Sequence, residues 1–377
     1  MGEWKKVKLG DCIKEVVEKT TENNQYEVLT SSKDGIVSQE EYFDKQVASK
    51  NNVGYKIIKK GQFTYRSMSD SGSFTINKLD NKDIGIVSPA YPVFEAKKIN
   101  SDYLKYFFDS EMFRRAIHNL SQGSTRTALK YKDLIEIEML LPPTEEQEKI
   151  VKILEKVDTI ISDIKDIINE SKKYMNYIMK KELETNNEMT KLSDLGEIVT
   201  GNTPKTSEKD NYGYDYNWVS PGDLGKNKYI VNTEKKLSKK GFDKSRKIPK
   251  GSIMVTCIGS TIGKIGIADE MCSTNQQINS IIVRDSVNNE FIYYAIKYNF
   301  KYFNDYISNQ AVTIINKTVF GNLKIPSKSR KEQEKIANVL RILDNKIENT
   351  EKMINLYCLL KNGLMQQLLT GKIKVKI

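Results

Sequence analysis

One five-residue segment, Glu-Gln-Glu-Lys-Ile, occurs twice in this chain, at residues 146–150 and 332–336. The copies are 186 residues apart, counted from Glu146 to Glu332, which is close to half of the 377 residues. The agreement continues in phase at three further pairs, Leu154 with Leu340, Asp158 with Asp344, and Ile161 with Ile347. A repeat of this length predicts that one structural module is present twice.

Weaker matches precede both copies of the segment, so the repeat extends beyond it. They are Lys8-Leu9-Gly10-Asp11 with Lys191-Leu192-Ser193-Asp194, Lys60-Gly61-Gln62-Phe63 with Lys250-Gly251-Ser252-Ile253, and Leu141-Pro142 with Ile325-Pro326. The chain therefore divides into four predicted regions, in the order globular, helical, globular, helical. We place them at residues 1–145, 146–188, 189–331 and 332–377.

Each helical region contains apolar residues at alternating spacings of four and three, which is typical of a helix with one apolar seam. The first seam consists of Ile150, Leu154, Val157, Ile161, Ile164, Ile168, Met175 and Ile178. The second consists of Ile336, Leu340, Leu343, Ile347, Ile354, Tyr357, Leu364 and Leu368. Ser171, Thr350 and Lys361 are polar residues at seam positions. Each helix is expected to have about 40 residues, or about 60 Å at 1.5 Å per residue.

The start of the first helix is also marked in the sequence. Pro142-Pro143-Thr144 is followed by Glu145 and Glu146, and acidic residues stabilise the first turn of a helix. Two seams of equal length in one chain favour pairing with each other, so we expect an antiparallel coiled coil whose halves are related by a pseudo-twofold axis. A coiled coil between two copies of the chain is the alternative interpretation.

Both globular regions have the pattern of mixed α/β domains. Short β-rich runs such as 251–256 and 278–283 lie between Gly, Asn and Ser turns. Helical patterns follow at 102–108 and 290–296, and their aromatic residues recur at the spacing of a buried helix face. The predicted fold is therefore α+β, with two mixed α/β domains separated by two long antiparallel coiled-coil helices.

Composition restricts the partners and the compartment. Lysine and arginine number 60 and aspartate and glutamate 49, so the formal net charge is +11, which favours a polyanionic partner. Cys12, Cys257, Cys272 and Cys358 form no Cys-x-x-Cys pair, and the one histidine, His118, has no cysteine beside it, so we expect no zinc site. Unpaired cysteines, the lack of a long apolar run and the lack of a signal peptide predict a cytoplasmic protein with no membrane contact.

Searches for catalytic motifs fail. Gly259-Ser260-Thr261-Ile262-Gly263-Lys264-Ile265 resembles a phosphate-binding loop but has three residues between the glycines and Ile after the lysine. No Asn-Pro-Pro-Tyr or Asp-Pro-Pro-Tyr methyltransferase motif occurs, and a single histidine excludes most histidine-based acid–base schemes. The sequence therefore predicts a protein without catalytic activity.

One alternative is a magnesium-dependent nuclease. Asp83 and the later Glu95-Ala96-Lys97 have the spacing of such a site, in which two carboxylates hold Mg²⁺ and the lysine orients a water. The same spacing arises by chance in a chain of which 29% is charged, and the second half has no equivalent. A coiled-coil scaffold without a role on DNA is a further alternative.

Polar loops after the predicted strands are better suited to DNA recognition. Backbone amides and hydroxyls bind phosphates, and Arg, Asn and Gln can bind a base edge with two hydrogen bonds. The same residue types are common in ordinary turns, which is the alternative interpretation for each of them. The candidates in the first half are Arg66, Ser67, Ser69, Ser71, Gly123, Ser124, Thr125, Arg126 and Lys130. Those in the second half are Ser260, Thr261, Lys264, Asn275, Gln276, Gln277, Asn309, Gln310 and Lys317.

With these motifs, the chain resembles the specificity subunits of type I restriction–modification systems. The entry to each helix, Leu-Pro or Ile-Pro followed by Glu-Gln-Glu-Lys-Ile, is similar to that family's helical regions, and the tail at 363–373, GLMQQLLTGKI, is the most specific match. Gly201-Asn202-Thr203-Pro204 with Trp218-Val219-Ser220, and the segment 85–91, are similar to parts of its target recognition domains.

The resemblance implies a division of labour in a complex. Each globular region would recognise one half of a split double-stranded DNA target, and the helices would set the gap and dock two methyltransferase (modification) subunits. S-adenosylmethionine would be on those subunits, while ATP and Mg²⁺ would be on the restriction motor–nuclease subunits, so this chain itself would bind no cofactor. No extended helix precedes residue 1, so we expect the C-terminal helix to pack against the N-terminal domain and the termini to be close together.

Overall fold

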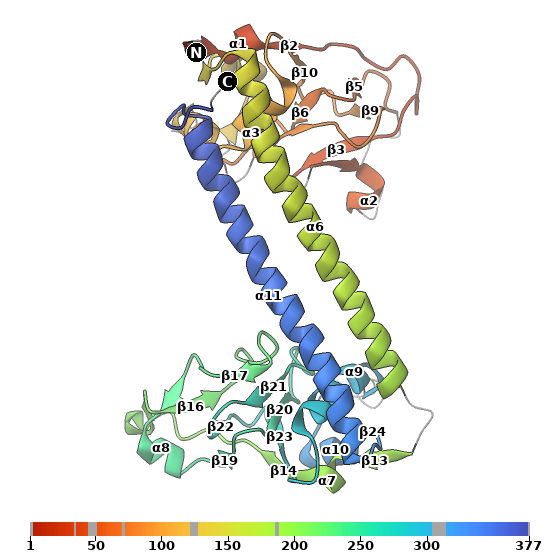
Figure 1. The fold of residues 1–377 in the computed structure, drawn as a ribbon, viewed down its shortest axis with the longest axis vertical. Helices are drawn as coiled ribbons and strands as arrows, with labels where there is room; N and C mark the ends of the chain where they lie inside the picture. Colours follow the sequence, from red (N-terminus) through yellow and green to blue (C-terminus); the bar gives the residue numbers. More distant parts are fainter. Residues whose placement is uncertain are drawn as a thin grey trace. The chain divides into compact units, whose positions relative to one another are not determined.

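The computed structural model describes residues 3–33, 35–43, 51–69, 72–120, 127–184, 188–303 and 314–375. The chain forms two compact units, Met1–Lys165 with Met353–Ile377 (unit 1) and Asp166–Lys352 (unit 2). Two long helices, α6 (Thr144–Leu183) and α11 (Arg330–Leu368), each contribute one part to either unit (Figure 1). No helix in these described ranges combines the length and the apolar character that a membrane span needs.

Unit 1 contains a mixed α/β domain built on an antiparallel sheet of four strands in the order β2-β10-β6-β8. Its strands are β1 (Lys5–Lys8), β2 (Ile13–Glu15), β3 (Leu29–Ser32), β4 (Gly35–Ser38), β5 (Lys56–Lys59), β6 (Phe63–Tyr65), β7 (Met68–Ser69), β8 (Ile76–Lys78), β9 (Ile84–Val87), β10 (Val93–Ala96), β11 (Thr127–Ala128) and β12 (Glu138–Leu141). Its short helices are α1 (Leu9–Cys12), α2 (Gln39–Phe43), α3 (Ser101–Asp109), α4 (Glu111–Leu120) and α5 (Tyr131–Leu134). Four strand pairs, β1-β12, β3-β4, β5-β9 and β7-β11, complete the domain.

Unit 2 contains a second mixed α/β domain with two five-stranded sheets, β14-β23-β20-β21-β17 and β15-β18-β16-β22-β19. Its strands are β13 (Met189–Lys191), β14 (Gly196–Thr200), β15 (Tyr212–Gly213), β16 (Tyr216–Val219), β17 (Tyr229–Ile230), β18 (Lys236–Leu237), β19 (Lys247–Ile248), β20 (Ile253–Thr256), β21 (Ile265–Ala268), β22 (Cys272–Thr274), β23 (Ile278–Val283) and β24 (Lys324–Pro326). Its helices are α7 (Leu192–Leu195), the 3-10 helix η1 (Lys209–Asn211), α8 (Lys239–Asp243), α9 (Asn289–Phe303) and α10 (Lys317–Asn322).

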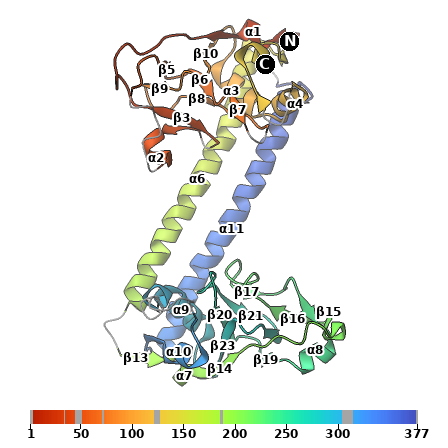
Figure 2. The same cartoon turned by 180° about the vertical axis from the view of Figure 1, so that it is seen from behind.

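The two domains repeat one topology. The order β2-β10-β6-β8 in unit 1 corresponds to β14-β23-β20-β21 in unit 2, and all neighbours in both runs are antiparallel. The pair β1-β12 that precedes α6 corresponds to the pair β13-β24 that precedes α11. Figure 2 shows the strands β14, β23, β20 and β21 of unit 2 gathered in one place. The predicted α+β fold with an internal repeat is confirmed.

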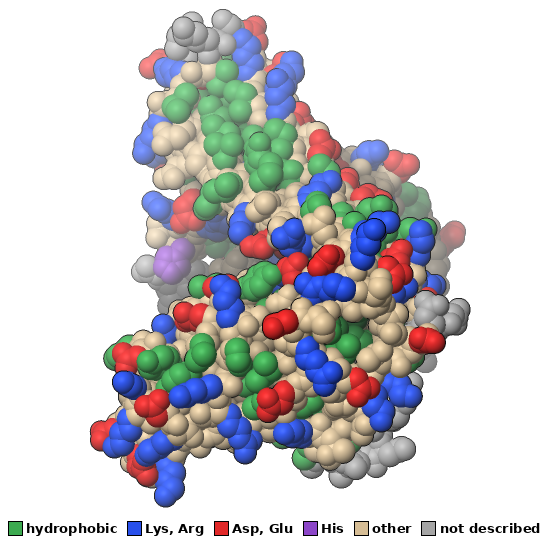
Figure 3. Space-filling view, turned by 60° about the horizontal axis from the view of Figure 1, so that its bottom comes forward, with side chains coloured by type: hydrophobic (Ala, Val, Ile, Leu, Met, Phe, Trp, Pro, Cys, Tyr) green, Lys and Arg blue, Asp and Glu red, His purple; other side chains and the backbone are tan. Residues whose placement is uncertain are grey.

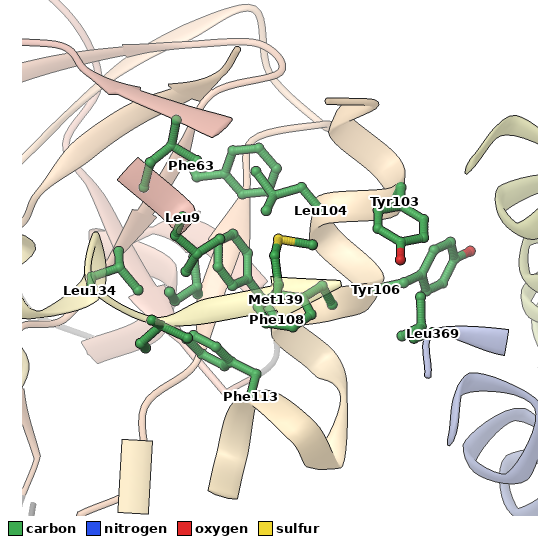
Figure 4. Packing of buried hydrophobic residues seen from close by; sticks show 14 of the residues in the cluster. Leu9, Phe63, Tyr103, Leu104, Tyr106, Phe108, Phe113, Leu134, Met139 and Leu369 are labelled. Carbon is green, nitrogen blue, oxygen red and sulfur yellow. The ribbon is translucent and has the colours of Figure 1, made fainter. Parts of the chain in front are cut away.

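The core of unit 1 joins its domain to both long helices. Phe63, Phe94, Phe108 and Phe113 pack with ring centroids 5.0–5.9 Å apart, and Figure 4 shows side chains from strands and helices converging on this cluster. Ile150 and Leu154 of α6, and Met365, Leu368 and Leu369 at the end of α11, belong to the same buried cluster. Burial of a large apolar side chain contributes about 1.5–3 kcal/mol, so the two helix ends are firmly held in this domain.

The segments near both termini also meet in unit 1. The indole of Trp4 donates a hydrogen bond to Glu146 Oε2 at 2.9 Å, and Gly371 packs against the same ring. The expected closeness of the termini is therefore confirmed.

The seam residues of the long helices are paired within each unit. In unit 1 the beginning of α6 packs against the end of α11, and Lys361 forms an ion pair with Asp158 at 2.6 Å. In unit 2 the end of α6 and the beginning of α11 are linked by Lys172 and Glu351 at 2.7 Å. The helices are thus antiparallel, and most of the first seam and part of the second are buried inside one chain. The half-buried seam residues are Ile178, Leu343, Ile354, Tyr357 and Leu364. Ser171 and Thr350, two of the polar seam residues, are buried.

The repeated glutamine, which is the second residue of each Glu-Gln-Glu-Lys-Ile segment, ties each domain to its long helix. Gln147 accepts a hydrogen bond from the Asn100 backbone N–H at 2.8 Å and donates one to the Pro142 carbonyl at 2.8 Å. Gln333 makes the equivalent bonds, to the Asn288 N–H at 2.9 Å and to the Lys328 carbonyl at 2.8 Å.

Both glutamine side chains are buried, with only 2% of Gln147 and 5% of Gln333 exposed. Each amide therefore satisfies two main-chain groups, one at the start of a domain helix and one before a long helix. Leaving such groups unpaired in a buried place would be costly.

We predict that Gln147→Leu, which keeps the side-chain volume but removes both hydrogen bonds, lowers the free energy of unfolding of unit 1 by about 2–4 kcal/mol. The measurement is urea unfolding followed by the fluorescence of Trp4, in a Trp218→Phe background so that one indole reports on unit 1. Gln366→Leu changes an exposed glutamine of α11 in the same unit and should leave the transition in place. Equal shifts for both variants would contradict this explanation of the repeat.

Candidate nucleic-acid interface

Three segments that are far apart in sequence meet beside the β20–β21 hairpin of unit 2. The Cys257 N–H donates to the Gln277 carbonyl at 2.7 Å, and the Ile315 N–H donates to the Cys257 carbonyl at 2.8 Å. A β-bridge joins Ile258 to Ile314. The fold therefore brings the hairpin loop with Ser260, Thr261 and Lys264, the turn with Asn275, Gln276 and Gln277, and Lys317 of α10 into one region.

Within this region the side chains differ in exposure. Ser260, Gln276 and Lys317 are exposed, whereas Thr261, Lys264 and Gln277 are half-buried. Asn275 is buried, and its Oδ1 accepts from the Gln277 N–H at 3.0 Å while its Nδ2 donates to Gln277 Oε1 at 3.2 Å. Asn275 therefore holds the turn and the Gln277 side chain, which leaves Gln276 as the exposed amide.

A second set of contacts adds residues that sequence reasoning did not select. The hydroxyl of Thr203 donates to Gln276 Oε1, and the exposed Arg246 donates through Nη1 to the Thr200 carbonyl at 2.6 Å. The Arg246 N–H also donates to Asn202 Oδ1 at 2.8 Å. Arg246 is an additional cation at the edge of the candidate interface. The sequence feature closest to its contacts was the motif at 201–204, which ends 42 residues before Arg246.

A buried asparagine, Asn279, links the segments that form this region. Asn279 accepts from the Thr200 hydroxyl at 2.6 Å and donates to the Ile315 carbonyl at 2.9 Å. Only 3% of Asn279 is exposed. Because it links β14 and β23 to the segment before α10, its amide fixes the spacing of the loops that contain the candidate residues.

The candidates of unit 1 lie in the equivalent place. Arg66, Ser67 and Ser69 follow β6, and β7 pairs with β11 so that Ser69 lies opposite Thr127. The Leu129 N–H donates to the Ser67 carbonyl at 3.0 Å, which matches the bond from Ile315 to Cys257 in unit 2. The exposed Lys130 precedes α5, as Asn316 precedes α10.

Seven of the candidate residues lie outside the described ranges. They are Ser71, Gly123, Ser124, Thr125, Arg126, Asn309 and Gln310. The first described residue after Arg126 is Thr127 in unit 1, and the first after Gln310 is Ile314 in unit 2. They lie at equivalent positions, Thr127 beside β7 and Ile314 beside Ile258.

Two cysteines of unit 2 lie in the core beneath this region. Burial raises the pKa of the Cys257 thiol to about 12, and burial likewise raises the pKa of Cys272 to about 12. Both thiols are therefore neutral at physiological pH and are poor nucleophiles.

The nuclease hypothesis finds no support in the geometry. The Asp83 side chain is 92% exposed, and its carboxylate is 3.7 Å from Lys60 Nζ. Glu95 belongs to a different sheet and accepts from Gln62 Nε2 at 3.3 Å. Lys97 follows β10, where its N–H donates to the Cys12 carbonyl. Among the described residues, no group of three or more His, Cys, Asp and Glu side chains is arranged to hold a metal ion.

We predict that Gly201→Ala disrupts the unit 2 interface, because an added Cβ would lie 2.2 Å from the carbonyl oxygen of Asn275 and 2.2 Å from Thr274 Oγ1. The turn that presents Gln276 must then shift, at an expected cost of roughly 1–3 kcal/mol. Trp218 donates to the Asn202 carbonyl at 3.3 Å, so its fluorescence in a Trp4→Phe background reports the change during urea unfolding. Gly222→Ala is the control, since its Cβ would meet nothing closer than 3.8 Å. An unfolding midpoint unchanged by Gly201→Ala would refute this account of the turn.

The fold has been seen in solved proteins. The type I restriction–modification S subunit of M. genitalium superimposes with a TM-score of 0.62 at 14% identity, covering 97% of this chain and 96% of that one. A second structure, described as the basis of complex assembly and conformational transition of the type I R-M system, gives 0.62 at 15% identity, with 98% of each chain covered. At these identities the likeness concerns the fold alone.

Proteins related in sequence to this chain are also specificity subunits of type I restriction enzymes. The MjaIX specificity subunit of Methanocaldococcus jannaschii is 33% identical over 171 residues, which is 44% of this chain and 39% of the relative. The HindI specificity subunit of Haemophilus influenzae is 34% identical over 196 residues, 49% of this chain and 41% of the relative. The chain thus spans about two fifths of the length of these two relatives, whereas it matches 75% of the MjaVIII specificity subunit of M. jannaschii at 27% identity.

The family model described as type I restriction modification DNA specificity domain matches this chain twice, over residues 1–172 and 184–356. Both matches contain one mixed α/β domain and the beginning of one long helix. The chain therefore belongs to the type I restriction modification DNA specificity family and carries two copies of its domain.

Proposed function

We propose that this chain is the non-catalytic specificity subunit of a type I restriction–modification complex and that it recognises a bipartite double-stranded DNA target. In this proposal residues 1–145 and 189–331 are the two target recognition domains, and residues 146–188 and 332–377 are the helical regions that separate them. The observation that supports it is the repeat itself, since two copies of one domain present exposed polar and cationic loops at equivalent places.

The chemistry of the loops suits a division between affinity and specificity. Lys130, Lys264, Lys317 and the newly found Arg246 supply positive charge for phosphates, which dominates affinity and makes it depend on salt. The exposed Gln276 offers an amide group of the kind that binds an adenine edge with two hydrogen bonds. The bond from Thr203 to Gln276 would orient that amide before DNA arrives.

Exposed apolar residues on the long helices fit a protein partner. Unit 1 exposes Met353, Leu356, Leu359 and Leu360 on α11, and unit 2 exposes Ile167, Tyr174 and Tyr177 on α6. Figure 3 shows hydrophobic side chains gathered on one face of the surface. Large exposed apolar patches mark interaction sites, so we assign these helix faces to two methyltransferase (modification) subunits.

The remaining components follow from that assignment. The modification subunits would carry S-adenosylmethionine, and restriction motor–nuclease subunits would carry ATP and Mg²⁺, while this chain supplies only recognition. We place the complex in the cytoplasm, where the DNA is.

The first test is the selection of bound duplexes from a random DNA library by the full chain together with its modification subunits. We expect two short motifs separated by a fixed gap. Gln276→Ala should relax one base position of one motif, at about 1–3 kcal/mol, whereas Lys264→Ala should weaken all sequences alike and reduce the salt slope by about one. Gln366→Ala on α11 is the matched control. Binding without any sequence preference would sink the proposal.

The second test concerns the helix faces. Leu356→Glu with Leu360→Glu places two charges in the proposed docking surface and should weaken association with a modification subunit at least tenfold, measured by analytical ultracentrifugation of the purified components. These side chains are exposed in the chain alone, so its thermal stability should change little. The control pair is Lys152→Glu with Lys156→Glu, two exposed lysines of α6 in the same unit. Undiminished association of the leucine variant would rule out this surface.

A further inference from the structure

Each unit contains one hydrogen bond from a tyrosine of a domain helix to an aspartate of a long helix. In unit 1 the Tyr106 hydroxyl on α3 donates to Asp158 Oδ2 on α6 at 2.8 Å. In unit 2 the Tyr294 hydroxyl on α9 donates to Asp344 Oδ2 on α11 at 3.1 Å. Asp158 and Asp344 are 186 residues apart, which is the spacing of the repeat, so the bond is a repeated feature of the fold.

A lysine lies against each tyrosine ring, and in unit 2 the carboxylate that it pairs with is that of Glu290, at 2.7 Å. Lys361 Nζ lies 5.2 Å from the centre of the Tyr106 ring and 2.6 Å from Asp158 Oδ1. Lys228 Nζ lies 5.1 Å from the centre of the Tyr294 ring and donates to its hydroxyl at 3.2 Å. The cation stabilises the ring face and the nearby negative charge together.

Burial keeps the tyrosines as donors. Only 4% of Tyr106 is exposed, and Tyr294 is fully buried. Burial, followed by the nearby carboxylate, raises the pKa of both hydroxyls well above the usual range, so they remain protonated at physiological pH. Each hydroxyl can therefore donate to its aspartate, as the distances of 2.8 Å and 3.1 Å indicate.

The spacing between the glutamine and the aspartate on each long helix shows how the two contacts together orient a domain. Gln147 and Asp158 are eleven residues apart on α6, and so are Gln333 and Asp344 on α11. Eleven residues are close to three turns, so both side chains leave the same face of the helix, about 16 Å apart. A domain bound at one point could turn about that point, whereas a domain bound at two points on one face is held at one angle.

We propose that the Tyr106–Asp158 and Tyr294–Asp344 contacts are positioning contacts that hold each recognition domain at a fixed angle on its helix and thereby set the number of base pairs between the two half-sites. The proposal rests on the function proposed above. Successive base pairs turn the groove by about 34°, since one helical turn contains about 10.5 of them. A modest change in the angle of a domain is therefore equivalent to a change of one base pair in the gap.

The test compares DNA duplexes that carry both selected half-sites with the preferred gap or with one base pair more or fewer. Tyr106→Phe, Tyr294→Phe and the double variant remove only hydroxyls, so the rings still fill the core. We expect the double variant to reduce the preference for the correct gap by about tenfold, which corresponds to about 1.4 kcal/mol, while the sequence preference within each half-site stays unchanged. Tyr103→Phe is the matched control, because its hydroxyl on the same α3 bonds within the domain, to the Leu140 carbonyl at 3.3 Å.

A double-mutant cycle tests whether the two groups act together. Tyr106→Phe should reduce the gap preference of the unmodified chain but add little in an Asp158→Ala background, where the hydroxyl has lost its acceptor. Equal weakening on all gap lengths would indicate a purely structural role and would overturn the proposal, as would an unchanged gap preference or additive effects in the cycle. If the unmodified chain with its modification subunits selects no bipartite site, the proposed function itself fails and this inference fails with it.

Discussion

Everything else in the structure depends on how each mixed α/β domain is attached to a long helix at the first turns of that helix. The contact is made by a buried side-chain amide, that of Gln147 or Gln333, which bonds to a main-chain donor and a main-chain acceptor at once. Because buried main-chain groups must find partners, the amide cannot be exchanged for an apolar or charged residue without a loss. This explains why the pentapeptide around it is the clearest repeat in the sequence.

The large-scale fold could be predicted from the sequence because periodicity reports burial directly. The seam positions Ile150, Leu154, Ile336 and Leu340 are buried as their spacing predicted, and the strand-rich runs became the central sheets. The role of Gln147 could not be predicted, because a polar residue among charged neighbours in a first turn has the pattern of an exposed one. Only the partners from elsewhere in the chain, Asn100 and Pro142, explain its burial.

The segments of the candidate interface could be predicted from the sequence, but the role of each residue in them could not. Loop composition located the segments around Ser67, Ser260 and Gln276, and the fold brings them to equivalent places. It could not distinguish the inward Asn275 from the outward Gln276, because adjacent residues of one turn have the same composition signal. It also missed Arg246, whose position depends on contacts with Thr200 and Asn202 in a distant strand and loop.

The division of unit 1 has a consequence for how the protein is made. Its core needs residues 4–154 together with residues 364–375, and the whole of unit 2 lies between them in sequence. Unit 2 is continuous, so it can form from its own residues, and its folding shortens the loop whose closure opposes completion of unit 1. Until residues 364–375 have left the ribosome, the part of the unit 1 core that they cover lacks these partners, so the first domain is completed only after the second has been synthesised.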